Sequence, residues 1–394
     1  MSKQASNAAH RVPVTTRAGT YTVSIGPNTL SSLGTVTEEL CPLPTRTSIV
    51  VADAGLPKDI VSTAMESLRE VSIEPVLHTL TPTEQAKSFQ SLEAILVAMS
   101  RAKLERGDPV IALGGGITGD VAGLAAALHH RGTPVLQCPT TLLAMVDASV
   151  GGKTAVNLTV EGSLYKNMVG AFSQPVAVLA DTNTLASLPD RAFRSGIAEC
   201  IKHTMLCADW GHESLIQYTD SSLDRVLTRD PDILPEFIAR NVAVKASVVQ
   251  ADETEDPQRA SLGRAVLNLG HTFAHALESH PELSPDGHPA HAPLTHGEAV
   301  ALGLVAASAA SEAMGIAPNN TLEHTSARVA RAQLPTQLQH LPREDSLVSA
   351  MTHDKKVRAG KLRLVLPTGD GHCTIIDNPP DRIVLAGFSA WQAG

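Results

Sequence analysis

Aromatic side chains are scarce in this chain, at 3% of its 394 residues. A core with so few rings must be filled by smaller apolar residues, so we expect it to be built from Ala, Val and Leu. Hydrophobic residues make up 43% of the chain and charged residues 18%, which is ordinary for a globular protein. The length is sufficient for two domains.

Blocks of like charge and long apolar runs are also missing. The net charge is −9, with no basic cluster, which argues against nucleic acid or an anionic membrane as a partner. The longest apolar run, Ala299–Ala310, falls well short of the roughly 20 residues of a membrane span. A small anionic substrate is not excluded, because it needs only a local group of Lys and Arg.

Cysteines at metal-binding or redox spacing are absent too. The five Cys are scattered, with no CxxC pair, which predicts free thiols in a reducing compartment. The opening residues, MSKQASNAAHRVPV, lack the apolar stretch of a secretory signal. We therefore expect a cytoplasmic protein in which residues 1–11 form a flexible tail.

What is present first is an alternation of strand-like and helix-like segments. Val12–Ile25 predicts a hairpin that turns at Ala18-Gly19. Further strands are expected at 48–52, 74–79, 109–113, 135–138 and 176–180, and helices at 59–71, 88–106 and 120–129. This alternation predicts an α/β domain with a parallel sheet over residues 12–190.

After residue 190 the pattern becomes mainly helical. Helices are expected at 194–208, 223–228, 234–252, 265–278, 297–314, 321–332 and 345–351, with a late hairpin around Gly369-Asp-Gly371. The sequence thus predicts an α/β domain with a parallel sheet, followed by a mainly α-helical domain over 191–394.

A glycine turn joins an expected strand to an expected helix. Gly114, Gly116 and Gly119 fit the pattern G-x-G-x-x-G, in which glycine lets backbone N–H groups approach a pyrophosphate at a helix N-terminus. The acidic residue usual about 20 positions later is missing. Asp53, at the end of an earlier strand, is a plausible ribose partner instead. The turn indicates a nucleotide or a phosphate without choosing between them.

Two lysines follow in Gly- and Asn-rich segments that read as loops. Lys153 comes after Gly151-Gly152, and Lys166 precedes Asn167. Lysine is a compact cation suited to phosphate. A lone lysine is more often a solvated surface charge, but this context favours a ligand.

Several polar residues gather on expected helices of the second half. Read as one helix, Arg264, Asn268, His271 and His275 share a stripe about 60° wide on an otherwise apolar segment. Such a stripe is costly unless something binds there. Two His at i and i+4 can also meet one metal ion.

A carboxylate and a third histidine extend this set. Glu199 lies on an apolar helix, facing Lys202 at i+3. Thr295 and Glu298 have the spacing of a capping box, which places His296 at the first helical position. Glu199 with two His would match catalytic zinc. The residues alone do not choose among His271, His275, His291 and His296 as ligands.

Seven segments in order resemble the 3-dehydroquinate synthase family, from about residue 12 to 380. They are Gly114–Asp120 (GGGITGD), 139–153 (PTTLLAMVDASVGGK), 166–172 (KNMVGAF), 188–191 (LPDR), 196–202 (GIAECIK), 268–273 (NLGHTF) and 354–356 (DKK).

The resemblance implies a lyase that depends on NAD and on Zn²⁺ or Co²⁺. The α/β domain, residues 12–190, would be the dinucleotide-binding domain, and the helical domain, residues 191–394, would bind the metal and the substrate. Its substrate would be a small anionic sugar phosphate, 3-deoxy-D-arabino-heptulosonate 7-phosphate, converted to 3-dehydroquinate and phosphate in the shikimate pathway of aromatic amino acid biosynthesis. Transient oxidation by NAD would permit phosphate elimination. Re-reduction and an intramolecular aldol closure would follow. A homodimer is expected.

The resemblance also implies residue roles. Glu199, His271 and His296 would hold the metal. The substrate would be bound by Lys153, Lys202, Arg264, Asn268, His275 and Lys356, with Asn167 beside it and Arg131 on its phosphate; His275 would also handle protons. NAD would contact residues near the strand ends: Asp53, Glu84, Lys87, Gly114, Gly115, Gly116, Ile117, Thr118, Gly119, Asp120, Thr140, Thr141, Asp147, Lys153, Lys166, Thr184, Leu185, Ala186 and Ser187.

Three stretches depart from the family pattern: 158–165 and 255–263 are longer than usual, and 280–293 is rich in Pro and His. Glu255 is a candidate for the substrate-site carboxylate, and His288 and His291 are expected to be loop residues. Alternative functions are 2-epi-5-epi-valiolone synthase, aminodehydroquinate synthase, a glycerol-type metal-dependent dehydrogenase and a non-catalytic metabolite-binding protein. The first typically replaces the Asn268/His275 pair present here.

Overall fold

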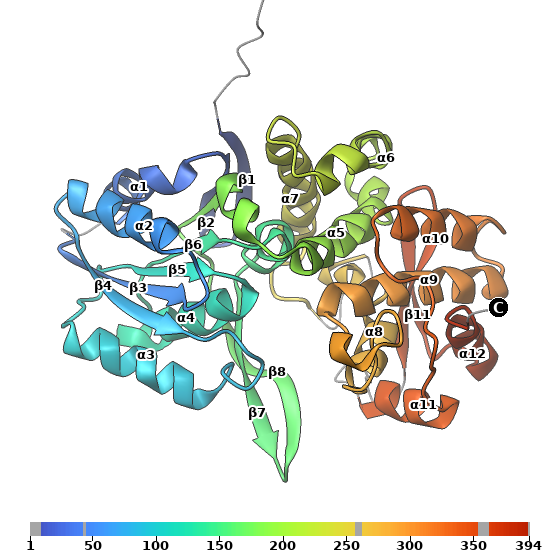
Figure 1. Ribbon diagram of the computed structural model, residues 1–394. Helices are drawn as coiled ribbons and strands as arrows, with labels where there is room; N and C mark the ends of the chain where they lie inside the picture. Colours follow the sequence, from blue (N-terminus) through green and yellow to red (C-terminus); the bar gives the residue numbers. More distant parts are fainter. Residues whose placement is uncertain (1–8, 42–44, 257–261, 354–361, 393–394) are drawn as a thin grey trace, which may run out of the picture. The chain divides into compact units, whose positions relative to one another are not determined.

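The computed structural model describes residues 9–41, 45–256, 262–353 and 362–392 (Figure 1). The chain forms two compact units. The first comprises Met1–Pro189 and Arg229–Gln250, and the second Asp190–Thr228 and Ala251–Gly394. Among the described residues, no helix is both long enough and apolar enough to cross a membrane.

The first unit is built on a seven-stranded sheet of order β1-β2-β9-β6-β5-β3-β4. The strands are β1 (His10–Thr16), β2 (Gly19–Gly26), β3 (Thr47–Asp53), β4 (Glu74–Leu80), β5 (Val110–Gly114), β6 (Val135–Pro139) and β9 (Ala177–Asp181). Only the hairpin β1–β2 is antiparallel among these described pairs. The predicted hairpin and parallel sheet are confirmed.

Both faces of this sheet are covered by helices. Side chains alternate along β3, so that Ile49 and Val51 enter one core cluster while Val50 and Ala52 enter the other. The first cluster includes residues of α3 (Phe89–Arg101) and α4 (Gly116–Leu128), and the second packs against α1 (Leu33–Leu40) and α2 (Lys58–Glu70). A strand buried on both faces explains the continuous apolar runs in the sequence.

The second unit is mainly helical. Its elements are α5 (Asp190–Thr204), α6 (Ser214–Leu227), α8 (His271–Glu278), α9 (His296–Met314), α10 (Thr321–Arg331), α11 (Glu344–His353) and α12 (Asp381–Ser389), with the hairpin β10 (Arg363–Gly369) and β11 (His372–Asp377). α9 is its centre, because α5, α8, α10 and α12 all pack against it. The expected fold class, a parallel-sheet α/β unit and a helical unit, is confirmed.

The boundaries of the N-terminal tail and of the first domain differ from the sequence-based expectation. His10 and Arg11, expected in the flexible tail, already pair in β1 with Ile25 and Ser24, while residues 1–8 lie outside the described residues. Almost all of α7 (Leu234–Ala251) belongs to the first unit rather than to the second domain. Its Lys245 pairs with Asp147, a tertiary contact that helical periodicity does not reveal.

The continuous helix expected from Arg264 to His275 is also interrupted. Arg264–Asn268 is a 3₁₀ turn, and Gly270 has φ 76° before α8 begins at His271. The reason is a close approach of two backbones: a Cβ on Gly303 of α9 would lie 2.1 Å from the Gly270 carbonyl oxygen. A left-handed residue at this contact favours glycine.

We predict that Gly303→Ala destabilises the second unit by about 1–3 kcal/mol, because its methyl group overpacks the α8–α9 contact. Urea unfolding followed by circular dichroism would measure the change. Glu323→Ala, an exposed site on α10, is the control and should shift the unfolding free energy by less than about 0.5 kcal/mol. Equal stability of the two variants would contradict the proposed contact.

Candidate functional site

The carboxyl ends of β3, β5, β6 and β9 lie along one edge of the sheet, because these strands are parallel. Asp53 ends β3, Gly114 ends β5, and Thr140 follows β6. The approach is close, since a Cβ on Gly114 would lie 3.1 Å from the Cβ of Asp53. The structure therefore brings Asp53, the glycine turn and Thr140 together, at the edge where open α/β sheets bind ligands.

Helix α4 begins within the glycine turn, at Gly116. Gly115 provides no side-chain cap, and the Thr118 hydroxyl is buried without a hydrogen-bond partner among the described residues. Room at the turn is limited: a Cβ on Gly116 would lie 3.2 Å from that of Ala148. An uncapped helix N-terminus with close backbone access favours an anionic group such as a phosphate.

A polar network adjoins this edge. The Lys87 ammonium contacts Asp120 and Asn167. Asn157 donates to the Glu84 carboxylate at 2.9 Å and accepts from the Asn167 backbone N–H at 2.9 Å. Four predicted site residues, Glu84, Lys87, Asp120 and Asn167, are thus joined through one residue that was not predicted. Burial raises the pKa of Asp120, and Lys87 offsets this only in part.

Lys153 and Lys166 lie on a β-ribbon rather than in loops. β7 (Lys153–Val160) pairs antiparallel with β8 (Ser163–Phe172), so the stretch 158–165 forms the end of a hairpin. Both lysine side chains are exposed. The composition suggested loops because Gly and Asn are rare in strands. Cross-strand pairing outweighs that preference here.

The other residues predicted to contact the nucleotide differ in position and in exposure. Ile117 and Gly119 lie in the first turns of α4, and a Cβ on Gly115 would lie 3.3 Å from Thr141. In the turn Thr182–Ser187, Thr184 donates to the Asp181 carbonyl at 2.7 Å and Leu185 is fully buried, while Ala186 and Ser187 are exposed. Thr184 and Leu185 can therefore offer a ligand mainly backbone groups.

Arg131 was predicted as a phosphate ligand, but it does not lie at the carboxyl ends of the strands. It follows the C-terminal end of α4, near the start of β6. The 13 residues of α4 span on the order of 20 Å, so Arg131 lies at the opposite edge of the sheet from the glycine turn. It has φ 63° and is exposed.

The three predicted metal ligands do come together in the second unit. Each of Glu199, His271 and His296 offers one ligand atom, and these atoms lie within 4.8 Å of one another. The His296 Nε2 is 3.2 Å and the His271 Nε2 3.4 Å from the same oxygen of Glu199. Two imidazoles and one carboxylate are the ligand set of many catalytic zinc sites. His275 and His291 are outside this group.

Two close backbone contacts assemble the trio from three helices. A Cβ on Gly297 of α9 would lie 2.1 Å from the Ser195 carbonyl oxygen of α5, and the Gly297 N–H donates to the Ser195 hydroxyl at 2.9 Å. The Gly270–Gly303 contact holds α8 against the same helix. These two contacts bring Glu199, His271 and His296 within reach of one ion.

Glu199 is a charge with no access to water: its side chain is 0% exposed. Burial alone would raise its pKa, but the Lys202 ammonium and His271 and His296 outweigh burial and hold the pKa well below its usual range. Lys202, predicted to contact substrate, pairs directly with Glu199 and is itself buried.

The second nitrogen of each imidazole is also held. The Nδ1 of His271 lies 3.1 Å from the Leu269 carbonyl oxygen, and that of His296 lies 2.7 Å from the Glu278 carboxylate. Metal-bound histidines usually donate their other N–H in this way, which fixes ring orientation and leaves Nε2 for the ion. Glu278 was not predicted; its position three residues after His275 carries no recognisable signal.

His296 is also fixed by the start of its helix. The predicted capping box is confirmed: Thr295 accepts from the Glu298 N–H, and Glu298 accepts from that of Thr295. Arg191 binds both oxygens of Glu298 and the carbonyl oxygens of His291 and Pro293. The Pro- and His-rich segment is thereby attached beside the trio, and its His291 pairs with Asp286 at 2.7 Å.

The predicted substrate residues of this unit surround the interrupted helix. Arg264 is 1% exposed and donates to the Glu253 carbonyl at 2.6 Å. Asn268 donates to the Glu255 carboxylate at 3.2 Å, so the candidate carboxylate does lie in this set. The His275 ring centre is 5.9 Å from that of His271. Lys356 lies outside the described residues.

One further residue, Lys245, was not predicted from the sequence. Lys245 is buried on α7 and pairs with Asp147, a predicted site residue. The sequence signal that could have identified Lys245 is a lysine within an apolar helix.

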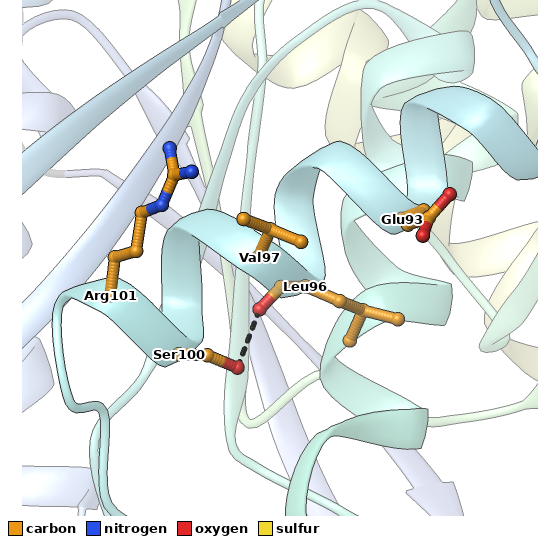
Figure 2. Close-up of a pocket in the computed structure, with 5 residues that line it drawn as sticks. All are labelled: Glu93, Leu96, Val97, Ser100 and Arg101. Carbon is orange, nitrogen blue, oxygen red and sulfur yellow. Dashed lines mark hydrogen bonds between the residues drawn. The ribbon is translucent and has the colours of Figure 1, made fainter.

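A hollow on the surface of α3 lies apart from the predicted site. It is lined by Glu93, Leu96, Val97, Ser100 and Arg101, none of which was predicted as a site residue (Figure 2).

Comparison with known proteins gives a consistent result. The family described as 3-dehydroquinate synthase N-terminal matches residues 77–195, and its C-terminal counterpart matches residues 196–357. The 3-dehydroquinate synthase of Caulobacter vibrioides is 38% identical over 381 residues, covering 96% of this chain and 97% of its own.

Solved structures share the fold. A 2-deoxy-scyllo-inosose synthase complexed with carbaglucose-6-phosphate, NAD⁺ and Co²⁺ has a TM-score of 0.78 at 22% identity, over 97% of this chain and 99% of its own. The 2-epi-5-epi-valiolone synthase of Streptomyces hygroscopicus subsp. jinggangensis 5008, with NAD⁺ and Zn²⁺ bound, has a TM-score of 0.78 at 25% identity, over 94% and 96%.

We predict that Glu278→Gln weakens Zn²⁺ binding by at least about tenfold, because His296 loses the carboxylate that orients it. Competition with a chromophoric chelator would measure the dissociation constant. Glu282→Gln removes a neighbouring exposed carboxylate that contacts His280 instead, and should leave affinity unchanged. Unchanged affinity in Glu278→Gln would exclude the orienting role.

We also predict that Zn²⁺ affinity rises with pH. Burial would lower the pKa of His296, but hydrogen bonds to Glu199 and Glu278 raise it from 6.5 to about 10 in the metal-free chain. Its proton therefore stabilises the metal-free fold below pH 6.5, and that contribution is lost as pH rises towards 10. A metal ion must displace the proton, so affinity should increase by up to about tenfold per pH unit in this window.

Calorimetry in buffers of different ionisation enthalpy would count the protons released on Zn²⁺ binding. His291→Ala should release as many protons as the parent. His296→Ala should release fewer and bind more weakly. If instead His291→Ala changes proton release and His296→Ala does not, the ligand assignment is wrong.

Proposed function

The chain belongs to the 3-dehydroquinate synthase family, and we propose that it converts 3-deoxy-D-arabino-heptulosonate 7-phosphate into 3-dehydroquinate and phosphate. The observation that carries this proposal is the Glu199–His271–His296 trio, built by glycine contacts and held by Lys202, Glu278 and Leu269. The family places this reaction in the shikimate pathway. It is a carbon–oxygen lyase reaction.

We propose that NAD binds at the carboxyl edge of the first unit's sheet. Three observations support the fit: the uncapped N-terminus of α4, the buried Thr118 hydroxyl, and glycines where a Cβ would meet Asp53 or Ala148. When bound, NAD would accept and later return a hydride, so that the substrate is a ketone when phosphate leaves. Asp53 would bond the ribose, and Lys87 and Asp120 would order the adjoining loop.

We propose a divalent ion, Zn²⁺ or Co²⁺, for the second unit. The donor set fits, because both Nε2 atoms face one oxygen of Glu199 and both Nδ1 atoms are engaged elsewhere. When bound, the ion would polarise substrate oxygens. Arg264 and Asn268 would orient an anionic substrate, and their contacts with Glu253 and Glu255 hold them in place beforehand. His275 would exchange a proton with the substrate.

Lys153, Lys166, Asn167 and Lys356 are proposed as further substrate or nucleotide contacts, on the basis of family resemblance. The same holds for Arg131 as a phosphate ligand. A cytoplasmic location and a homodimer are part of the proposal. All five cysteines are buried free thiols, as predicted, which fits a reducing compartment.

Two alternative functions would require a different substrate contact or a different use of NAD. A valiolone-type cyclase acts on a sugar phosphate without a carboxylate, so it would not need the buried Arg264 to hold one. A glycerol-type dehydrogenase would consume NAD stoichiometrically. Asn268 and His275 beside the trio favour the dehydroquinate reaction.

We predict that phosphate release from the heptulosonate phosphate requires NAD, but that reduced nicotinamide does not accumulate. Substoichiometric NAD should support many turnovers, which a colorimetric phosphate assay and the nicotinamide absorbance would follow together.

Arg264→Ala should lower kcat/KM for the heptulosonate phosphate by at least about tenfold, because a charge-assisted contact with the substrate is lost.

The control substrate is sedoheptulose 7-phosphate, which lacks the carboxylate. The parent should prefer the heptulosonate at least about tenfold, and Arg264→Ala should reduce that preference. Steady production of reduced nicotinamide would establish the dehydrogenase instead. Equal efficiency on both sugars would favour the valiolone alternative.

A further inference from the structure

One side of α5 meets the first turn of α9 at three successive points. Arg191, Ser195 and Glu199 are spaced four residues apart, so their side chains follow one another along that side of the helix. Their partners are three consecutive residues of α9, taken in the opposite order. The pairs are Arg191 with Glu298 at 2.8 Å, Ser195 with Gly297 at 2.9 Å, and Glu199 with His296 at 3.2 Å. The helix that carries one proposed metal ligand therefore also holds the turn that carries another.

The contact at Arg191 lies farthest from the trio and has the most hydrogen bonds. Its guanidinium donates to both oxygens of the Glu298 carboxylate, at 2.8 and 2.7 Å. It also donates to the carbonyl oxygens of His291 and Pro293, at 2.7 and 2.8 Å. A bidentate pair of arginine and carboxylate fixes the relative orientation of the two groups. Because the Glu298 side chain is only 7% exposed, its charge depends on this cation more than on water.

His296 lies between the points that Arg191 holds. Before it, the chain is tied to the guanidinium through the Pro293 carbonyl. After it, Glu298 is tied to the same guanidinium and also accepts the Thr295 backbone N–H at 2.8 Å. The backbone of His296 is thus fixed on both sides. A metal ligand needs such support, because productive site geometry must be held to within about 0.5 Å.

We propose that Arg191 is a positioning residue for the metal centre. It is not one of the ligand residues; it sets the backbone from which His296 reaches the ion. Lysine cannot replace it, because a single ammonium cannot present the planar fork that bonds both carboxylate oxygens at once. This inference rests on the proposed metal site.

Arg191→Lys tests the role, because it keeps the positive charge and removes the fork. It should weaken Zn²⁺ binding by about tenfold, measured by competition with a chromophoric chelator. The visible absorption of the Co²⁺-loaded protein, which responds to ligand geometry, should also change. Thermal unfolding of the same samples without metal separates altered ligand geometry from lost stability.

Arg194→Lys is the matched control on the same helix. Arg194 donates to the Gln333 side chain at 2.9 Å rather than to the first turn of α9. This variant should therefore keep the parent's Zn²⁺ affinity and the parent's Co²⁺ absorption.

Glu298→Gln tests the same contact from α9, with the size of the side chain preserved. It should weaken Zn²⁺ binding and alter the Co²⁺ absorption in the same way as Arg191→Lys. The double variant should bind Zn²⁺ about as well as the weaker single variant, because both substitutions remove one shared contact. If Arg191→Lys does not fold, the affinity and spectrum of Glu298→Gln decide the question.

Two results would overturn the positioning role. One is Arg191→Lys with the affinity and the Co²⁺ spectrum of the parent, even if its unfolding temperature falls, since the contact would then be structural only. The other is a double variant in which the two losses of affinity simply add. Failure of the proposed function gives a different result: His296→Ala would then bind Zn²⁺ as tightly as the parent.

Discussion

A carboxylate removed from water organises the second unit. Ionised Glu199 can be buried only if nearby positive charge and hydrogen-bond donors replace its hydration. Lys202 provides the charge from the same helix, and His271 and His296 complete the shell from two others. α5, α8 and α9 must therefore meet at this point. The same arrangement leaves two imidazole nitrogens and a carboxylate converging on a space that suits a metal ion.

Polar groups are positioned by different structural features in the two units. In the first, the groups follow the ends of parallel strands, and a network through Asn157 ties the neighbouring loop to α4 and the β-ribbon. In the second, close backbone contacts do the positioning. Gly297 lies against Ser195, and Gly303 against Gly270, at distances that leave no room for a side chain. Strand order determines the first site, and interhelical distance determines the second.

The sequence predicted much of this because its local patterns agree with the fold. Apolar runs predicted the parallel sheet, and the spacing of Thr295 and Glu298 predicted the start of α9. What it missed depends on contacts distant along the chain. Gly270 is left-handed because α9 lies against it, and α7 joins the first unit through Lys245 and Asp147. The ribbon β7–β8 forms by pairing despite loop-like composition. Glu278 is identified only by the His296 ring it contacts.

The position of His296 at the start of α9 has an electrical consequence. Nineteen residues of helix direct the positive end of their dipole at the trio. The negative charges of Glu199 and Glu278 counteract this positive potential. With a divalent ion bound, the ion and Lys202 together would outweigh the two carboxylates, and the centre would carry a net positive charge. Anions of any kind are then drawn to it from about one Debye length, roughly 10 Å at 0.1 M salt. Phosphate and sulfate buffers would therefore occupy the centre of a metal-loaded sample, whereas buffers with bulky, weakly coordinating anions would leave it open.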